Sequence, residues 1–157
     1  MVDKNEKFYI GTTRFTTDTY AENRAWRKKH NWKGCIYGLN KKMPKIVPYM
    51  ALVYVLEMNN DTNRIEGIGL IRNYINFDYK TCIYSDRNYN RYIYNSAFWC
   101  DRTDISQKKV LEILERVVFY GSGHYKRGQG ITTINWNKFD SLGTKLMKNF
   151  FGNLFLN

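Results

Sequence analysis

The sequence predicts an α+β fold in which a small mixed β-barrel, or a strongly curved sheet, is flanked by about three helices. Residues 1–157 fit a single domain, and hydrophobic residues make up 43% of them, which is enough for one core. Strand-like and helix-like segments follow one another in the order β, α, several β, α, β, α. Because turns rather than helices join the middle strands, a doubly wound parallel sheet is disfavoured.

The first strand and the first helix are expected close to the N-terminus. Residues 7–11 (KFYIG) have the composition of a short strand. Thr19 and Glu22 match a capping box, in which two side chains satisfy free N–H groups at the start of a helix. This pattern predicts a helix that begins at Thr19 and runs to about Asn31.

A β-hairpin is the clearest element of the sequence. Residues 49–58 (YMALVYVLEM) and 64–73 (RIEGIGLIRN) have strand composition, and the turn-forming residues 59–63 (NNDTN) separate them. Gly67 and Gly69 leave one face of the return strand without side chains. We therefore expect a tight bend there, or the close approach of another element.

Two shorter strands, residues 81–84 and 91–99, are expected after the hairpin. Asp104 and Gln107 can cap a helix that follows, and Gly121 is a natural stop for it. Its apolar stripe consists of Val110, Leu114, Val117 and Val118.

The C-terminal part begins with a basic, glycine-rich loop, residues 121–130 (GSGHYKRGQG). A strand over residues 131–134 and a last helix over residues 139–151 follow. The apolar side of that helix would carry Leu142, Leu146 and Phe150.

A net charge of +11 favours a polyanionic partner, because binding to phosphates releases counterions. The abundance of Lys, Asn, Ile, Tyr and Phe also fits an AT-rich genome, so part of the charge has a compositional origin. Three groups of basic residues stand out. They are Arg24 and Lys28 on the first helix, the stretch from Arg87 to Arg91, and Lys126 with Arg127 in the glycine-rich loop.

The cysteines and the N-terminus point to an intracellular protein. Cys35, Cys82 and Cys100 are widely spaced and form no Cys-x-x-Cys pair, so reduced, buried thiols are expected. No basic segment followed by a long apolar stretch opens the chain, and no window approaches the about 18 apolar residues of a membrane span. We expect the cytoplasm or the nucleus, and no membrane partner.

Signals for catalysis are weak. His30 and His124 have no partner at metal-ligand spacing, so no zinc site is expected. The glycine-rich loop lacks the Gly-Lys-Ser/Thr ending of a P-loop, and no cofactor is expected. Glu57 with Glu66, or Asp101 before a helix, would suit a metal-dependent nuclease. Acidic residues that flank turns or cap helices are ordinary, so the nuclease remains the alternative to a binding module.

Two segments combine features that suit nucleic acid. Lys126 and Arg127 carry charge in a loop whose glycines let an anion approach the backbone, which favours phosphate contacts. Tyr84, Arg87 and Tyr89 interleave aromatic and basic side chains, and stacking of a base on an exposed ring contributes about 1 to 3 kcal/mol.

Four segments, in the right order, resemble the YTH domain. Residues 51–71 (ALVYVLEMNNDTNRIEGIGLI) resemble its apolar strand, short turn and glycine-containing return strand. Residues 7–26 (KFYIGTTRFTTDTYAENRAW) resemble its first strand and the polar helix that ends at a tryptophan. Residues 84–89 (YSDRNY) are similar to its loop with two tryptophans, and residues 126–131 (KRGQGI) to its late Arg-Asp-Gly-Gln-Glu-Ile motif.

This resemblance implies a PUA-like barrel that reads N6-methyladenosine in single-stranded RNA through an aromatic cage. Trp32, or Trp26 if the helix is shorter, would be the first wall, and Tyr84 and Tyr89 the other two. Two tyrosines in place of tryptophans would make a smaller and more polar cage. The alternative is that Trp26, Trp32 and Tyr84 simply fill the core.

The resemblance also implies roles for the hairpin turn and the glycine-rich loop. Asn59, Asn60 or Asp61 would reach the edge of the base, and Lys126 and Arg127 would hold phosphates. Parts of the hairpin and of the loop also resemble uncharacterised proteins of large DNA viruses, which would place the protein in a host cell. A module that binds virion or host proteins is a further alternative.

Overall fold

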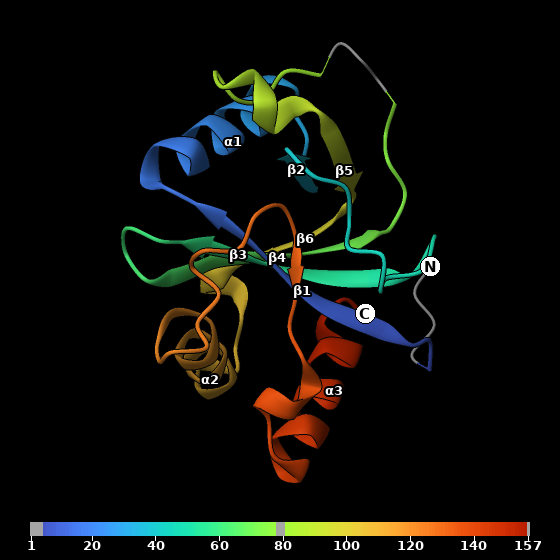
Figure 1. Ribbon diagram of the computed structural model, residues 1–157, viewed down its shortest axis with the longest axis vertical. Coiled ribbons are helices and arrows are strands. Elements are labelled where there is room, and N and C mark those ends of the chain that lie inside the picture. Colours follow the sequence, from blue (N-terminus) through green and yellow to red (C-terminus); the bar gives the residue numbers. More distant parts are fainter. Residues whose placement is uncertain (1–4, 78–80, 157) are drawn as a thin grey trace.

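The protein is seen in a computed structural model that describes residues 5–77 and 81–156. Within these residues a five-stranded sheet lies between two layers, with α2 and α3 on one face and α1 with a two-stranded sheet on the other (Figure 1). The three helices are α1 (Thr17–Lys29), α2 (Lys108–Phe119) and α3 (Ser141–Leu154). The predicted α+β class with three helices is confirmed.

The larger sheet has the strand order β6-β4-β3-β1-β7. Its central strands β1 and β3 are parallel, and the other pairs are antiparallel. The smaller sheet pairs β2 with β5, antiparallel. The strands are β1 (Phe8–Phe15), β2 (Cys35–Leu39), β3 (Leu52–Asn59), β4 (Arg64–Arg72), β5 (Tyr92–Ser96), β6 (Phe98–Asp101) and β7 (Thr132–Thr133).

The predicted barrel is not formed, because β6 and β7 are opposite edges of an open sheet. The stretch 91–99, expected to be one strand, divides at Ala97 into β5 and β6. The first part pairs with β2 and the second with β4, so the chain changes sheets at this point. The predicted strand over residues 81–84 is absent, and β2 was not predicted.

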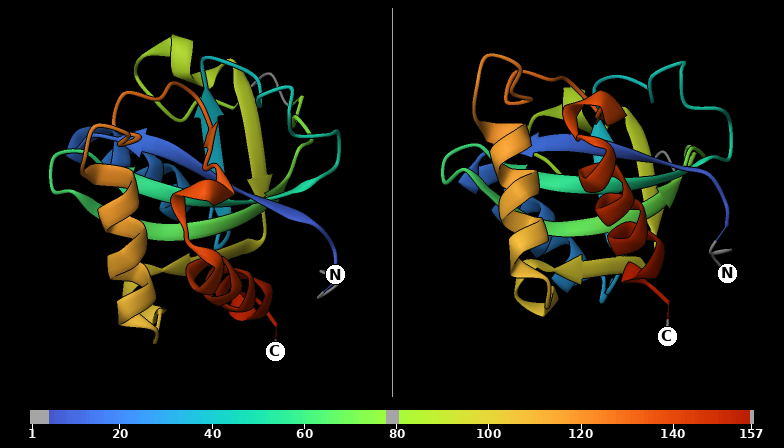
Figure 2. Two further views of the ribbon diagram at one scale, coloured as in Figure 1. Left: turned by 60° about the horizontal axis from the view of Figure 1, so that its bottom comes forward. Right: turned by 90° about the horizontal axis from the view of Figure 1, so that it is seen from below.

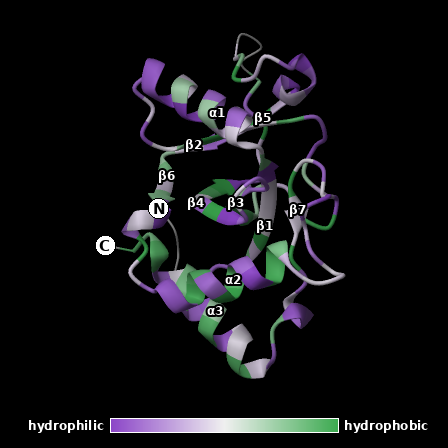
Figure 3. Ribbon diagram, turned by 90° about the vertical axis from the view of Figure 1, so that its left-hand side faces the viewer, coloured by the Kyte–Doolittle hydropathy of each residue, from purple (hydrophilic) through white to green (hydrophobic). Residues whose placement is uncertain are grey.

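Two apolar clusters fill the spaces on either side of the larger sheet. Leu52, Tyr54 and Leu56 of β3 point towards α2 and α3, which lie side by side on that face (Figure 2). The alternating residues Val53 and Val55 point towards the smaller sheet and α1. Every residue of β3 is buried. In Figure 3, β3 and β4 are largely hydrophobic, whereas α1 is largely hydrophilic. Burial on both faces explains the unbroken apolar run in the sequence.

Two helices begin at other residues than predicted. The N-cap of α1 is Thr16, whose hydroxyl accepts from the N–H of Thr19, so the capping box is Thr16 with Thr19 and not Thr19 with Glu22. Asp104 belongs to a short 3-10 helix and does not cap α2, which begins after Gln107. Both errors arise because several Thr and Asp residues near a helix start fit the same pattern.

The last helix buries a different side from the one expected. Its N-cap is Asp140, and its buried residues are Met147, Phe150 and Phe151. Leu142 and Leu146 are 77% and 38% exposed, so the predicted stripe is wrong for both of them. No helix within residues 5–77 and 81–156 is long and apolar enough to cross a membrane.

The bare face of β4 is explained by the close approach of other elements. A Cβ on Gly69 would collide with the Tyr37 hydroxyl and lie 2.7 Å from Cys35 Sγ on β2. A Cβ on Gly67 would lie 2.8 Å from Trp99 Nε1 on β6. The two glycines therefore make room for polar side chains that enter the core between the sheets.

Candidate functional site

A pocket of about 280 Å³ lies where the end of β1, the start of α1, the end of β2 and three connecting segments meet. We call it the aromatic pocket. Its aromatic lining residues are Phe15, Tyr37, Tyr84 and Tyr89, and its amide lining residues are Asn40, Asn60 and Gln129. These residues come from segments far apart in the sequence, so the pocket exists only in the folded chain.

Two of the tyrosines that line the pocket have their hydroxyls bonded inside the core. The Tyr37 hydroxyl donates to Glu57 Oε2 at 2.7 Å, inside the core. The Tyr84 hydroxyl accepts from Asn23 Nδ2 at 3.0 Å, also in the core. Both tyrosines are buried, and desolvation raises the pKa of each hydroxyl. Because both hydroxyls are bonded inside the core, Tyr37 and Tyr84 add little polarity to the wall of the pocket.

The loop that carries Tyr84 and Tyr89 packs closely on β2. A Cβ on Gly38 would collide with the Tyr89 carbonyl and lie 3.2 Å from the Tyr84 ring, so a side chain there would push the loop away. Asn90 Oδ1 accepts from the backbone N–H groups of Ile83 and Tyr84 at 2.9 and 3.0 Å. These contacts hold both rings at the pocket.

Two asparagines join the glycine-rich loop to the pocket. Asn60 Nδ2 donates to the Lys126 carbonyl at 2.9 Å, and Asn40 Nδ2 donates to Gln129 Oε1 at 3.1 Å. The Oδ1 atom of each asparagine is buried and accepts no hydrogen bond from the described residues. Buried acceptors without a partner are uncommon in folded proteins and call for an explanation.

One basic residue lines the pocket, and others lie on the segments that form it. Arg14 is part of its lining and is exposed. Lys41 is exposed beside Asn40, with its Cβ 3.4 Å from the position that a Cβ on Gly130 would take. Arg87 lies on the short helix that carries Tyr89, and Lys126 Nζ donates to Asn63 Oδ1 at 2.7 Å. Arg127 is exposed on the same loop as Lys126.

The structure brings together some of the residues that the sequence singled out. Tyr84, Tyr89 and Asn60 line one pocket. Trp26 and Trp32 are not among its lining residues: Trp26 stacks on His30 with 4.1 Å between the rings, and Trp32 Nε1 donates to the Cys35 carbonyl at 3.0 Å. Neither tryptophan therefore contributes a wall of this pocket.

The wall that the sequence did not reveal is Tyr37, next to Gly38 on β2. The run CIYGL was not recognised as a strand, although Tyr37 and its neighbours are apolar or aromatic and end at a glycine. Phe15, at the end of β1, was missed because the strand was expected to stop at Gly11.

Asn59 and Asp61, the other two residues of the hairpin turn that were expected to contact a base, bond to neighbouring residues of the fold. Asn59 is buried, donates to Glu66 Oε2 at 3.3 Å, and accepts from the Asp61 N–H at 3.0 Å. Asp61 Oδ2 accepts from the N–H of Thr17 at 2.8 Å, at the start of α1. Neither lines the pocket.

The basic residues of α1 lie away from the pocket. Arg24 pairs with Asp101 at 3.2 Å, and its guanidinium lies over the Trp99 ring. Lys28 is in the last turn of α1, whereas the pocket is formed by residues at the start of that helix.

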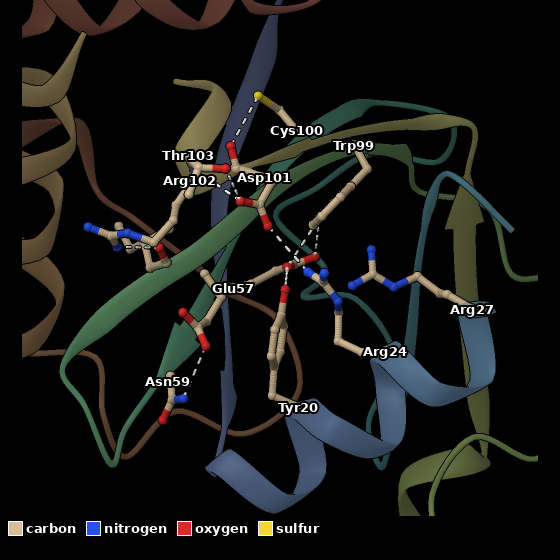
Figure 4. A network of polar contacts seen from close by, with 12 residues as sticks. Tyr20, Arg24, Arg27, Glu57, Asn59, Trp99, Cys100, Asp101, Arg102 and Thr103 are labelled. Atoms are coloured by element: carbon tan, nitrogen blue, oxygen red, sulfur yellow. Dashed lines mark hydrogen bonds and ion pairs between the residues drawn. The ribbon is translucent and has the colours of Figure 1, made fainter. Parts of the chain in front are cut away.

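Behind the pocket lies a buried carboxylate, Glu57, which is 1% exposed. It accepts from the Tyr20 hydroxyl at 2.9 Å and from Trp99 Nε1 at 3.1 and 3.2 Å (Figure 4). It also accepts from the Tyr37 hydroxyl at 2.7 Å. Three donors thus share the two oxygens of the carboxylate, with the single indole N–H of Trp99 divided between them. The arrangement thus leaves little room for the metal that a nuclease site at Glu57 would require.

Potential metal ligands do not gather elsewhere in the described part of the chain. Within it, no three His, Cys, Asp or Glu side chains are grouped as they would be around a metal ion.

Comparisons with protein-family models, with curated proteins and with solved structures gave no match for this chain. Its function therefore has to be inferred from the chemistry of the aromatic pocket.

Proposed function

We propose that this chain is a non-catalytic module that binds single-stranded nucleic acid, RNA in preference to DNA, by taking one unstacked base into the aromatic pocket. The observation that carries the proposal is the meeting of Tyr37, Tyr84 and Tyr89 at one pocket whose lining also includes Arg14. Proteins that recognise single strands combine aromatic rings, on which bases stack, with cations that contact the backbone.

The size of the pocket suits a single ring system. Pockets for drug-sized ligands usually measure about 300 to 1,000 Å³. At about 280 Å³ the aromatic pocket lies just below that range. A base with the start of its sugar is a better match than an extended peptide or a lipid chain.

The charge around the pocket favours a nucleotide over a cation. Aromatic cages also bind ammonium and guanidinium groups through cation-π contacts. Here Arg14 lines the pocket and Lys41 is adjacent, within a chain of net charge +11. These charges repel a cationic ligand and attract a neutral ring that is attached to phosphates.

The base that we propose is N6-methyladenosine, read by a YTH-like domain in an intracellular, viral setting. The resemblance of the hairpin and of residues 84–89 to the YTH domain supports this choice. Tyr89 supports it as well, since it lines the pocket, is 38% exposed and can offer its ring to a methylated base.

A protein-interaction role is the second candidate, because an apolar surface lies outside the aromatic pocket. Tyr49 and Tyr74 are 73% and 52% exposed, and their rings are 6.2 Å apart. Met50, Tyr74 and Phe98 line a cavity of about 300 Å³ at this place. Exposed apolar patches often mark binding surfaces. We call these four residues the apolar surface patch.

Binding of short RNAs tests the proposal. We expect RNA with one N6-methyladenine to bind more tightly than the unmodified RNA, as measured by fluorescence anisotropy. Tyr89→Ala should weaken binding about tenfold, the effect of losing one stacking contact. Tyr89 is 38% exposed, so its loss should leave the fold intact.

Tyr120→Ala is the matched control, since Tyr120 is exposed at the end of α2 and does not line the pocket. It should bind both RNAs as the wild type does. Equal affinities of the wild type and Tyr89→Ala for every RNA would overturn base binding in the pocket. Equal affinities for methylated and unmethylated RNA would overturn only the choice of base.

A further inference from the structure

We infer that the apolar surface patch binds an acidic partner protein, which inserts one apolar side chain into the cavity of about 300 Å³ at this place. Met50, Tyr74 and Phe98 of the patch line the cavity, and Tyr49 lies beside Tyr74. The inference is independent of the base binding proposed above, because the cavity and the aromatic pocket share no lining residue.

The cavity lies where the chain changes from one sheet to the other. β6 pairs with β4 only as far as Leu70, whose partner is Phe98. Just before Phe98 the chain belongs to β5, which pairs with β2 in the smaller sheet (Figure 1). Ile71 and Arg72, the last residues of β4, extend past the pairing with β6 and line the cavity. The cavity is therefore a consequence of the fold and does not depend on one loop.

Met50 is held at the cavity in an unfavourable backbone conformation. Its φ of 68° lies in the left-handed region, which residues other than glycine rarely adopt. Its N–H donates to the Asn73 carbonyl at 3.0 Å, and its carbonyl accepts from Arg72 Nη1 at 3.0 Å. Residues kept in such conformations cluster at functional sites, and an exposed methionine adapts its shape to the apolar group that it contacts.

The composition of the patch favours a protein as the partner. Tyrosine, phenylalanine, methionine and arginine are enriched at protein interfaces, and the patch and the cavity combine all four. A nucleic acid is a poorer match, since the arginine of the cavity is already neutralised. Arg72 donates from Nη1 and Nη2 to the Glu6 carboxylate at 2.7 and 3.2 Å.

Charge favours an acidic partner over a second copy of this chain. The segments that line the cavity, residues 50–52, 70–74 and 95–98, contain no Asp or Glu. Lys45 is exposed on the segment that leads to Tyr49, and the net charge is +11. Two copies of so basic a chain repel each other, whereas an acidic protein is attracted. We therefore expect acidic residues on both sides of the inserted apolar side chain.

A library of short random peptides displayed on phage tests the inference on the wild-type protein. Enriched sequences are synthesised, and their affinities are measured by fluorescence anisotropy. We expect these sequences to share one aromatic or leucine residue flanked by Asp or Glu, and to bind with a micromolar Kd. Enrichment of neutral or basic sequences, or of no sequence at all, would overturn the inference.

Two variants locate the bound peptide. Tyr74→Ala removes an exposed ring from the cavity and should weaken peptide binding about tenfold, as the loss of an anchoring tyrosine does at protein interfaces. Tyr120→Ala removes an exposed ring at the end of α2 and should leave the affinity unchanged. Equal affinities of the wild type and Tyr74→Ala would contradict binding at the patch.

Two further measurements separate the other possible occupants. A short RNA should not displace the peptide, and displacement would assign the patch to nucleic acid and overturn the inference. Sedimentation should show a monomer, and a dimer that Tyr74→Ala dissociates would make a second copy the occupant. Tyr89→Ala should bind the peptide as the wild type does, so this inference and the proposed function can fail separately.

Discussion

The buried residue Glu57 holds three side chains in place behind the aromatic pocket. Its buried carboxylate is the common acceptor for Tyr20, Tyr37 and Trp99. The guanidinium of Arg27 lies 4.3 Å from the centre of the Trp99 ring and places a positive charge near this network. Because Tyr37 is also a wall of the pocket, the position of that wall depends on a residue that does not itself line the pocket.

Glu57→Gln should destabilise the protein. The amide has one acceptor oxygen in place of two, and it brings a donor into a site already filled with donors. Hydrogen bonds to a charged group contribute about 1.5 to 3 kcal/mol, so we expect the free energy of unfolding to fall by about 2 kcal/mol. Urea denaturation measures it. Glu112→Gln, at an exposed position on α2, is the control. Equal losses in both variants would contradict this role of Glu57.

The cysteines should differ in reactivity. Cys35 is fully buried, and burial raises its pKa to about 11. Cys82 is exposed. The thiolate is the reactive form, so iodoacetamide should modify Cys82 in the folded protein and reach Cys35 only after unfolding. Mass spectrometry of the alkylated peptides distinguishes the two sites. Comparable labelling of Cys35 and Cys82 in the native protein would show that this part of the core opens readily.

At the scale of elements, the start of α1 is stabilised by its own capping residues and by a residue of the hairpin turn. Thr16 and Thr19 form the capping box, and Asp61 reaches across from the hairpin turn to accept from the N–H of Thr17. The carboxylate also lies at the positive end of the helix dipole. This contact ties the turn between β3 and β4 to the helix that borders the pocket.

Asp61→Ala should therefore lower stability by about 1 kcal/mol, the usual cost of losing an N-terminal acceptor. Thermal or urea denaturation measures the loss. Asp104→Ala is the comparison, since the sequence suggested a cap for α2 at this exposed residue and the structure has it in a separate 3-10 helix. We expect a change within about 0.5 kcal/mol there. A larger loss of stability in Asp104→Ala than in Asp61→Ala would mean that Asp104, and not Asp61, supports a helix.

Elements with a local signal could be predicted from the sequence. The hairpin of β3 and β4 follows from two apolar runs around NNDTN, and α2 from an apolar stripe at helical spacing, with Val110, Leu114 and Val118 buried as expected. The division of residues 91–99 between two sheets depends on partners distant in sequence, β2 and β4. No pattern within the segment carries that information.

The same distinction holds for the candidate site. Tyr84, Tyr89 and Asn60 were found because aromatic, basic and turn residues stand out along the chain. Tyr37 was missed, since it reads as an ordinary strand residue and becomes a wall only where η1 (Arg87–Asn90) packs on Gly38. Trp32 was a misleading choice because its indole finds a partner in the nearby Cys35 carbonyl.

For the whole molecule, the position of a charge matters more than the net charge of +11. Arg14 lines the pocket, whereas Lys28 lies in the last turn of α1. An RNA that places one base in the pocket should bring its phosphates to the first of these residues and not to the second.

The salt dependence of RNA binding should reflect this difference. For a single strand, the logarithm of the affinity falls with the logarithm of the salt concentration by about 0.7 for each phosphate neutralised. Arg14→Gln should make the slope shallower by about that amount, and Lys28→Gln should leave it unchanged. Anisotropy titrations at several salt concentrations provide the slopes. Equal slopes for both variants would indicate binding through diffuse charge rather than at the pocket.

The location of the bound base tests the central claim most directly. A short RNA is cross-linked to the protein by ultraviolet light, and mass spectrometry identifies the modified residues. Tyr89, the exposed tyrosine of the aromatic pocket, should carry the cross-link if the base enters there. Cross-links at Tyr49 and Tyr74 of the apolar surface patch, with none at the pocket, would contradict the account.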